Sequence, residues 1–118
     1  MRYLLLIYTT ETGGDLDPSD PAVQEEMEAY GKFTADLQGS GAMLAGEALH
    51  PTSTATSVQV RDGETVTTDG PFAETKEALG GFYMVEAADL DEAIGWAARI
   101  PGARRGTIEV RPIMEIPQ

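Results

Sequence analysis

The sequence contains no cysteine, and this absence excludes several kinds of chemistry. Disulfide bonds, thiolate nucleophiles and zinc–thiolate sites all need a cysteine. The same absence fits a reducing compartment, so we expect a cytoplasmic protein. The apolar opening, residues 1–8, is too short for a signal peptide and no small-residue cleavage site follows it. No other apolar run reaches the length of a membrane helix, so we predict no membrane partner.

Basic residues are also scarce, at 8 against 20 acidic ones, which gives a formal net charge of −12. Nucleic acid binding depends on Lys and Arg that displace counterions from phosphates, so nucleic acid is not an expected partner. Anionic membrane surfaces are disfavoured for the same reason. The simplest role of the charge is solubility.

The pattern of apolar residues and turn signals predicts one α+β domain over residues 1–118. Asp20-Pro21 begins a helix that Gly39 and Gly41 end, and the capping box Asp89 to Glu92 begins a second helix over 89–100. Asp62-Gly63 is the turn of a hairpin formed by residues 56–61 and 64–68. The remaining strands are expected at residues 2–8, 42–49, 81–86 and 107–114. Two apolar stripes should face the core: Val23, Met27, Tyr30, Phe33 and Leu37 on the first helix, and Leu90, Ile94, Ala97 and Ile100 with the second.

The order of these elements, without the inserted hairpin, is the β-α-β-β-α-β of ferredoxin-like folds. Two helices would cover one face of an antiparallel sheet. The first strand is apolar on both faces, so the other sheet face should be apolar too. Large exposed apolar patches usually mark an interface. We therefore expect a homodimer in which two sheets pack face to face.

The loop from Thr68 to Gly80 has the composition of a pocket wall. Asp69-Gly70-Pro71 is a turn signal, and Phe72 should anchor the loop by burying its ring. Glu74, Lys76 and Glu77 then bring both signs of charge together. The structural alternative is a plain connector in which Asp69 caps its own turn.

This segment, from Thr68-Asp69-Gly70-Pro71-Phe72 through Leu79-Gly80-Gly81-Phe82-Tyr83, resembles the signature of DGPF-domain proteins in the YCII-related superfamily. The similarity extends to residues 1–8, 45–49, 91–97 and 109–113. It implies a dimeric α+β barrel of ferredoxin-like protomers, and it implies no settled reaction. Some members are associated with sigma factors. A branch that resembles lyases carries a helix histidine, and Tyr30 stands near that position here.

Further candidate residues lie outside the loop. Tyr30 could donate a proton or contact a ligand, although its place on the apolar stripe also fits simple packing. Glu47 lies on a strand among small residues, which leaves space before its carboxylate. His50 is the only histidine and could titrate near neutral pH, although a surface position is commoner. Arg104-Arg105 could hold an anion or form ion pairs. No metal-ligand spacing is present, so no metal or other cofactor is predicted.

These residues lead to three hypotheses. The first is a homodimer that binds a small organic molecule and performs lyase-like proton transfer, with Asp69 or Glu47 as base and Tyr30 nearby. Its ligand contacts would come from Phe72, Glu74, Lys76, His50 and Tyr83. The second is a non-enzymatic regulatory module associated with sigma-factor-dependent transcription. The third is a structural dimer whose loop closes the barrel.

Overall fold

The computed structural model describes residues 1–11 and 17–117. Six strands and two α-helices occur within these ranges, which confirms the α+β class. In chain order they are β1 (Arg2–Thr9), α1 (Pro21–Ser40), β2 (Met43–Ala48), β3 (Thr56–Arg61), β4 (Glu64–Asp69), β5 (Ala78–Glu86), α2 (Leu90–Arg99) and β6 (Thr107–Pro112). Two short 3-10 helices that the sequence pattern does not signal are η1 (Thr52–Thr54) and η2 (Pro101–Arg104).

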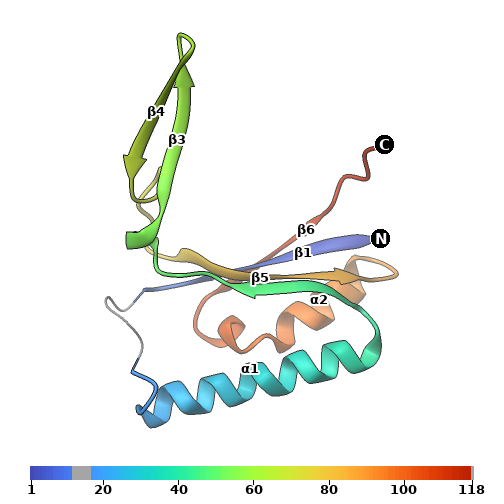
Figure 1. The fold of residues 1–118 in the computed structure, drawn as a ribbon. Coiled ribbons are helices and arrows are strands. Elements are labelled where there is room, and N and C mark those ends of the chain that lie inside the picture. Colours follow the sequence, from blue (N-terminus) through green and yellow to red (C-terminus); the bar gives the residue numbers. More distant parts are fainter. Residues whose placement is uncertain (12–16, 118) are drawn as a thin grey trace.

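Four strands form one antiparallel sheet in the order β2-β5-β1-β6. Both helices lie on one face of this sheet (Figure 1). This arrangement is compatible with a ferredoxin-like fold once β3 and β4 are set aside. Strand β5 begins at Ala78 and not at Gly81 as predicted. Ile7 pairs with Gly81 and the next residue, Tyr8, pairs with Leu79, so Gly80 has no partner on β1 and forms a bulge. Strand β5 continues through this bulge.

The helix ends follow the predicted capping signals. The Asp20 carboxylate accepts a hydrogen bond from the Ala22 N–H at 2.9 Å. Gly41 ends α1 with φ +80°, a left-handed conformation that glycine adopts without strain. At the start of α2 the Asp89 carboxylate accepts from the Glu92 N–H at 2.9 Å. The two aspartates each satisfy a backbone N–H that has no hydrogen-bond partner within the helix, and Gly41 turns the chain away at the other end of α1.

The core lies between the helices and the sheet face that they cover. Its members are Tyr3, Leu5 and Ile7 of β1, Tyr83 and Val85 of β5, Phe33 and Leu37 of α1, and Ala87, Ala93, Ala97 and Ile100. The predicted stripes were wrong at three positions, since Met27, Leu90 and Ile94 are exposed. Helix α2 packs through its small residues Ala93 and Ala97, which turns Leu90 and Ile94 away from the sheet.

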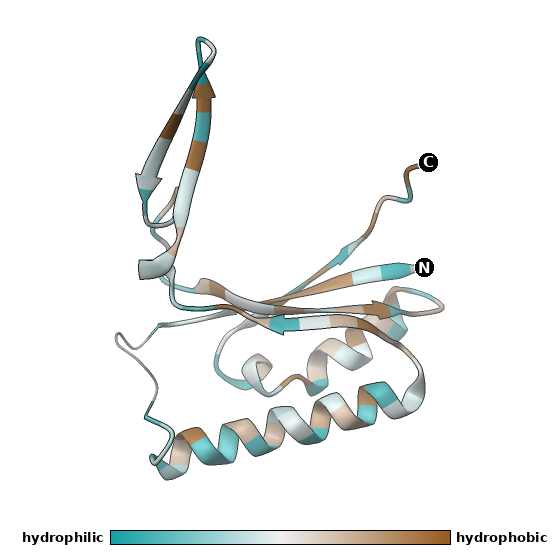
Figure 2. Cartoon of the chain, in the orientation of Figure 1, coloured by the Kyte–Doolittle hydropathy of each residue, from teal (hydrophilic) through white to brown (hydrophobic). Residues whose placement is uncertain are grey.

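Strands β3 and β4 form a separate two-stranded hairpin, here called the arm (residues 56–69). Its turn residues Asp62 and Gly63 have φ of +52° and +78°, as a type I′ turn requires. The arm projects from the sheet on the side opposite the helices (Figure 1). Brown apolar segments alternate with hydrophilic ones along it (Figure 2).

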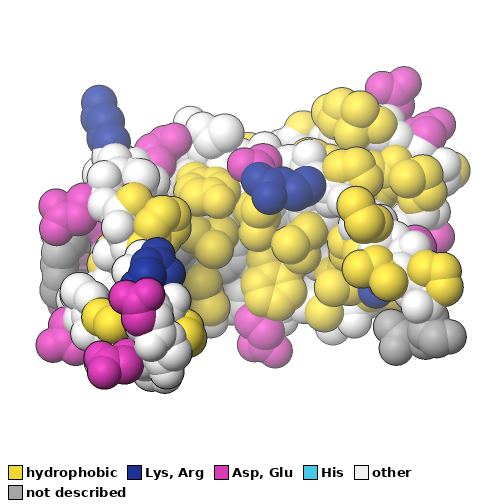
Figure 3. Space-filling model, turned by 90° about the horizontal axis from the view of Figure 1, so that it is seen from above, with side chains coloured by type: hydrophobic (Ala, Val, Ile, Leu, Met, Phe, Trp, Pro, Cys, Tyr) yellow, Lys and Arg dark blue, Asp and Glu magenta, His cyan; other side chains and the backbone are white. Residues whose placement is uncertain are grey.

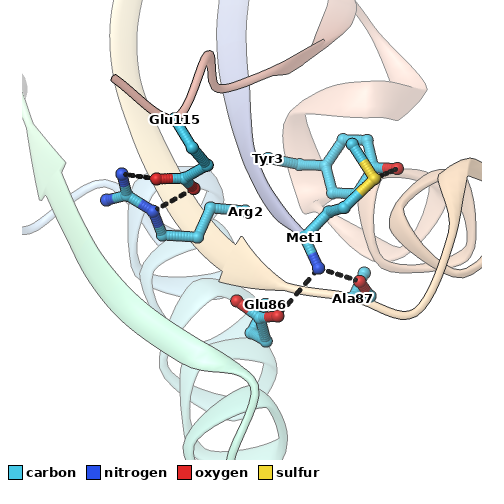
Figure 4. Close-up of polar contacts among 6 residues, drawn as sticks. All are labelled: Met1, Arg2, Tyr3, Glu86, Ala87 and Glu115. Carbon is cyan, nitrogen blue, oxygen red and sulfur yellow. Dashed lines mark hydrogen bonds and ion pairs between the residues drawn. The ribbon is translucent and has the colours of Figure 1, made fainter. Parts of the chain in front are cut away.

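Both chain ends are tied to the sheet by charged groups (Figure 4). The Arg2 guanidinium donates to Glu115 through Nε at 2.7 Å and Nη2 at 2.8 Å. The Ile113 N–H donates to the Arg2 carbonyl at 2.9 Å. The Met1 amino group meets the Glu86 carboxylate at 2.8 Å. The segment after β6 is therefore held beside the start of β1.

Candidate functional site

Two adjoining hollows lie at the end of the sheet where β1 ends and β5 begins. The smaller, of about 480 Å³, is bordered by the loop over residues 70–76. The larger, of about 1050 Å³, lies between that end of the sheet, the first turns of α1 and η2. Residues of the loop before η1, including His50, form part of its wall. Both hollows share three residues: Glu11, Thr52 and Ser53.

Glu11 and Thr52 form the boundary between the hollows. One Glu11 oxygen accepts from the Thr52 N–H at 2.9 Å, and the other accepts from the Thr52 hydroxyl at 2.6 Å. These two hydrogen bonds hold the pKa of the Glu11 carboxyl below its usual range. Glu11 therefore stays ionised and fixes the first residue of η1 near the end of β1.

The larger hollow brings together three of the few residues that can carry positive charge: His50, Arg104 and Arg105. Arg105 is neutralised by Glu26, whose Oε1 accepts from Nε at 3.0 Å and also contacts Nη2. Arg104 is exposed and forms no ion pair within residues 1–11 and 17–117. The larger hollow therefore holds one arginine that has no ion pair to the residues that the structure describes.

The ion pairs of all basic residues in the described chain show which of these residues are unpaired. Ion pairs occupy Arg2, Arg99, Arg105 and Arg111. The four remaining basic residues, without an ion pair to described residues, are Lys32, Arg61, Lys76 and Arg104. Lys76 borders the smaller hollow and Arg104 the larger. Two of the four unpaired cations thus lie at this end of the sheet.

Three of the predicted site residues border these hollows. Glu74 and Lys76 line the smaller one, and His50 lines the larger. Asp69 is the last residue of β4 and lies outside both, as does Phe72. The Phe72 ring is 90 % exposed, so the prediction that it anchors the loop by burial was wrong. Within one chain, nothing of the core lies beneath it.

The turn after β4 is closed by backbone groups. The Gly70 N–H donates to the Ala55 carbonyl at 2.7 Å, and the Ser57 hydroxyl donates to the Gly70 carbonyl at 2.8 Å. Gly70 has φ +94°, which explains the glycine in the Asp-Gly-Pro sequence. The turn therefore closes without the Asp69 carboxylate acting as its cap.

Tyr30 lies on the helix side of the sheet. Its hydroxyl oxygen accepts a hydrogen bond from the Gly102 N–H at 3.1 Å. Burial raises the pKa of Tyr30, and the negative charge of Glu26 raises it further. A Cβ on Gly102 would lie 2.7 Å from that oxygen, so the glycine makes the contact possible. This hydroxyl joins α1 to η2.

Tyr83 also belongs to the core. Its hydroxyl is 2.7 Å from the Thr34 hydroxyl, and its ring meets Phe33 edge-on at 5.1 Å. Glu47 faces the other way, because it pairs with Phe82, the neighbour of Tyr83 on the opposite sheet face. Glu47, Tyr30 and Asp69 therefore do not converge within one chain. Glu47 is on the sheet face opposite the helices, Tyr30 is on α1 against η2, and Asp69 is at the end of the arm.

Comparison with known proteins identifies the family of this chain. The sequence profile of the YCII-related domain matches residues 1–117. The chain belongs to the YCII-related family. An uncharacterised protein of Rhizobium meliloti (strain 1021) is 36 % identical over 117 residues, which cover 96 % of this chain and 92 % of the relative. The finer resemblance to DGPF-domain proteins stays a prediction.

The chemistry of this YCII-related chain therefore rests on side chains brought together by folding. Sequence reasoning missed Glu11 and Thr52, which are 41 positions apart. No local pattern signals their contact. In the described ranges, no group of three or more His, Asp or Glu is placed to hold a metal ion. No helix of the described chain is long and apolar enough to cross a membrane.

Proposed function

We propose that this YCII-related protein is a homodimer that binds a small organic anion in the larger hollow of each chain, with Arg104 holding the anionic group. The observation that carries the proposal is the position of Arg104. It is a cation without an ion pair to described residues, and it borders a hollow of about 1050 Å³. Sites for small molecules have volumes of roughly 300–1000 Å³, so this hollow is slightly larger than the typical range.

The net charge of −12 does not prevent anion binding at this position. Interactions between exposed charges weaken beyond about 8 Å at physiological ionic strength. Carboxylates farther away than this are therefore largely screened. Glu11, Asp20, Glu25 and Glu26 belong to the same wall as Arg104. Glu26 pairs with Arg105, while Glu11 and Asp20 accept hydrogen bonds from Thr52 and Ala22, so the ligand must place its anionic group directly on Arg104. A guanidinium also binds a carboxylate or phosphate through two parallel hydrogen bonds, which fixes the ligand's orientation. Thr9 and Thr10 border the same hollow and add hydroxyl groups for the uncharged part.

Proton transfer on the bound molecule is the chemistry that we propose as the finer alternative to simple binding. His50 lies in the wall of the larger hollow, and an imidazole is a common general acid or base. Asp69 and Glu47 lie outside both hollows of a single chain. Either carboxylate could act as the base only if the second chain brought a ligand to it.

A binding experiment with matched arginine variants tests the anion site. A library of small carboxylates and phosphate esters would be screened by thermal shift, and hits measured by calorimetry. We expect Arg104→Ala to weaken binding about 10- to 100-fold, since a hydrogen bond to a charged group contributes about 1.5–3 kcal/mol. Arg61→Ala is the control, because Arg61 also has no ion pair to described residues but lies at the tip of the arm. Equal affinity in both variants would overturn the site.

The dimer is supported by the sheet face that the helices leave uncovered, here called the open face. Along β1, core residues alternate with half-buried ones, and Leu4, Leu6 and Tyr8 point to this side. Phe82 and Met84 of β5 are their neighbours. Apolar side chains spread across the open face in Figure 3. An apolar surface of this extent is typical of an interface between proteins.

The shape of a single chain supports the same conclusion. Its accessible surface is 8401 Å², whereas a folded monomer of 12.6 kDa exposes about 6200 Å². Its radius of gyration is 16.3 Å, against about 13.5 Å for a compact domain of this length. The surplus of about 2000 Å² exceeds the roughly 800 Å² that each partner buries in a standard interface.

Light scattering coupled to size exclusion tests the dimer. We expect twice the chain mass for the wild type and a shift to the monomer for Leu6→Asp, which places a charge at the centre of the open face. Ile94→Asp, on the exposed side of α2, is the control and should remain a dimer. A monomeric wild type at micromolar concentration would contradict the proposal.

A further inference from the structure

The arm, residues 56–69, is a two-stranded hairpin with almost no cover. Every residue of β4 and all but one of β3 are exposed. Val58 and Val60 alternate with polar residues and so share one face, whereas Val66 pairs with Gln59 on the other. Phe72 follows directly after the base of the arm and is the most exposed large apolar residue of the described chain.

An exposed hairpin of this kind is poorly stabilised by itself. Two-stranded hairpins are marginally stable in water unless a third strand or another surface packs on them. Fully burying a valine or phenylalanine contributes about 1.5–3 kcal/mol, and much of that is not gained while Val58 and Val60 are 61 % exposed and Phe72 is 90 % exposed. The arm therefore has the composition of a segment that is packed against something in the working protein.

We propose that the arm packs against a second copy of this chain, so that each arm clasps the body of its partner. This inference rests on the homodimer proposed above. Each arm strand has six residues and so is about 20 Å long, while sheets that pack face to face lie about 10 Å apart. The arm stands on the same side as the open face (Figure 1). A chain stacked on that face must therefore lie alongside it.

Thiol reactivity tests this contact, because an introduced cysteine is the only thiol in the chain. Val60→Cys is compared with Met27→Cys on α1. The two positions have equal exposure in a single chain, 61 % for Val60 and 62 % for Met27. Rates with a thiol reagent are divided by the rates in denaturant, which removes intrinsic differences between the sites. We expect Val60→Cys to react about tenfold or more slowly than Met27→Cys in the dimer, since thiol reactivity depends on access.

The outcomes separate the arm from the dimer. A wild type that is monomeric contradicts both. A dimer in which the two cysteines react equally overturns the arm contact and leaves the dimer standing. Protection that disappears in the Leu6→Asp background, with the fold checked by circular dichroism, identifies the partner as its source. The same protection in a monomeric Leu6→Asp chain would show that the arm folds onto its own body and would also overturn the proposal.

A second variant tests the energetic contribution of the arm. Val58→Thr with Val60→Thr keeps two β-branched residues that suit a strand and removes apolar surface. We expect the dimer dissociation constant, measured by sedimentation equilibrium, to rise about 10- to 100-fold. An unchanged constant would contradict the contact. The matched control is Met27→Thr, whose position lies on the helix side and should leave the constant unchanged.

Discussion

Replacing Gly46 with alanine would test whether Tyr83 is a fixed part of the core. A Cβ at position 46 would lie 2.8 Å from Tyr83 Cδ1 and 3.1 Å from its Cε1. The ring cannot easily move away, because its hydroxyl bonds to Thr34 at 2.7 Å and the ring packs edge-to-face with Phe33. Met43 Cε, at 2.9 Å, is the flexible end of a side chain and can move.

The expected cost is the difference between two effects. Overpacking a core costs about 1–3 kcal/mol. Restricting the unfolded chain by Gly→Ala stabilises by about 0.4–1 kcal/mol. We therefore expect a net loss of about 1–2 kcal/mol, which lowers the unfolding midpoint by about 4–8 °C in a chain of 118 residues.

Thermal unfolding of a double-mutant cycle measures this loss. In the Tyr83→Leu background the ring is gone, so Gly46→Ala should cost nothing or stabilise slightly. Gly31→Ala is the control, because a Cβ there meets nothing within 4 Å and should stabilise α1. Chain concentration is held constant because an oligomer's midpoint depends on it. The packing argument fails if Gly46→Ala costs the same with and without the tyrosine ring.

Three other predictions concern single residues. The pKa of Tyr30 is raised in the folded state, so its protonated hydroxyl contributes fully to folding stability below about pH 10, and this contribution is lost as pH rises through the folded pKa. Between pH 8 and 11 the free energy of unfolding, measured in urea, should therefore fall less for Tyr30→Phe than for the wild type. Parallel pH dependences in the two proteins would refute this. Asp89→Ala removes the acceptor of the Glu92 N–H and should cost about 1 kcal/mol, measured by urea unfolding against the exposed control Asp91→Ala. Asp69→Ala should change stability by less than about 0.5 kcal/mol, since Asp69 is exposed and backbone groups close its turn; loss of the fold on circular dichroism would show a structural role.

Local signals predicted most of the fold because they act within a few residues. The Asp20 and Asp89 carboxylates each accept a hydrogen bond from a backbone N–H two or three positions further along the chain. The Asp62-Gly63 turn depends only on the backbone conformation of these two residues. Alternation along β1 indicated two apolar faces. The stripes on the helices were less reliable at Met27 and Ile94, because which side of a helix is buried depends on how closely the next layer approaches.

The candidate site was harder to predict than the fold. Phe72, Glu74 and Lys76 are neighbours in sequence, yet the first is fully open to solvent while the other two border a hollow. Arg104 and His50 were visible as isolated residues. Their presence in one wall follows from the placement of η2 beside the end of β1, which no short pattern encodes.

The α+β class, the helix caps, the hairpin turn and the apolar character of both faces of β1 follow from the sequence, because each depends on neighbouring residues and on the period of the chain. Other features depend on the folded arrangement: Tyr83 packs against Phe33 while Glu47 faces away, and Glu26 pairs with Arg105 while Arg104 has no ion pair to described residues. Such contacts join residues tens of positions apart, and their energies depend on distances that exist only after folding.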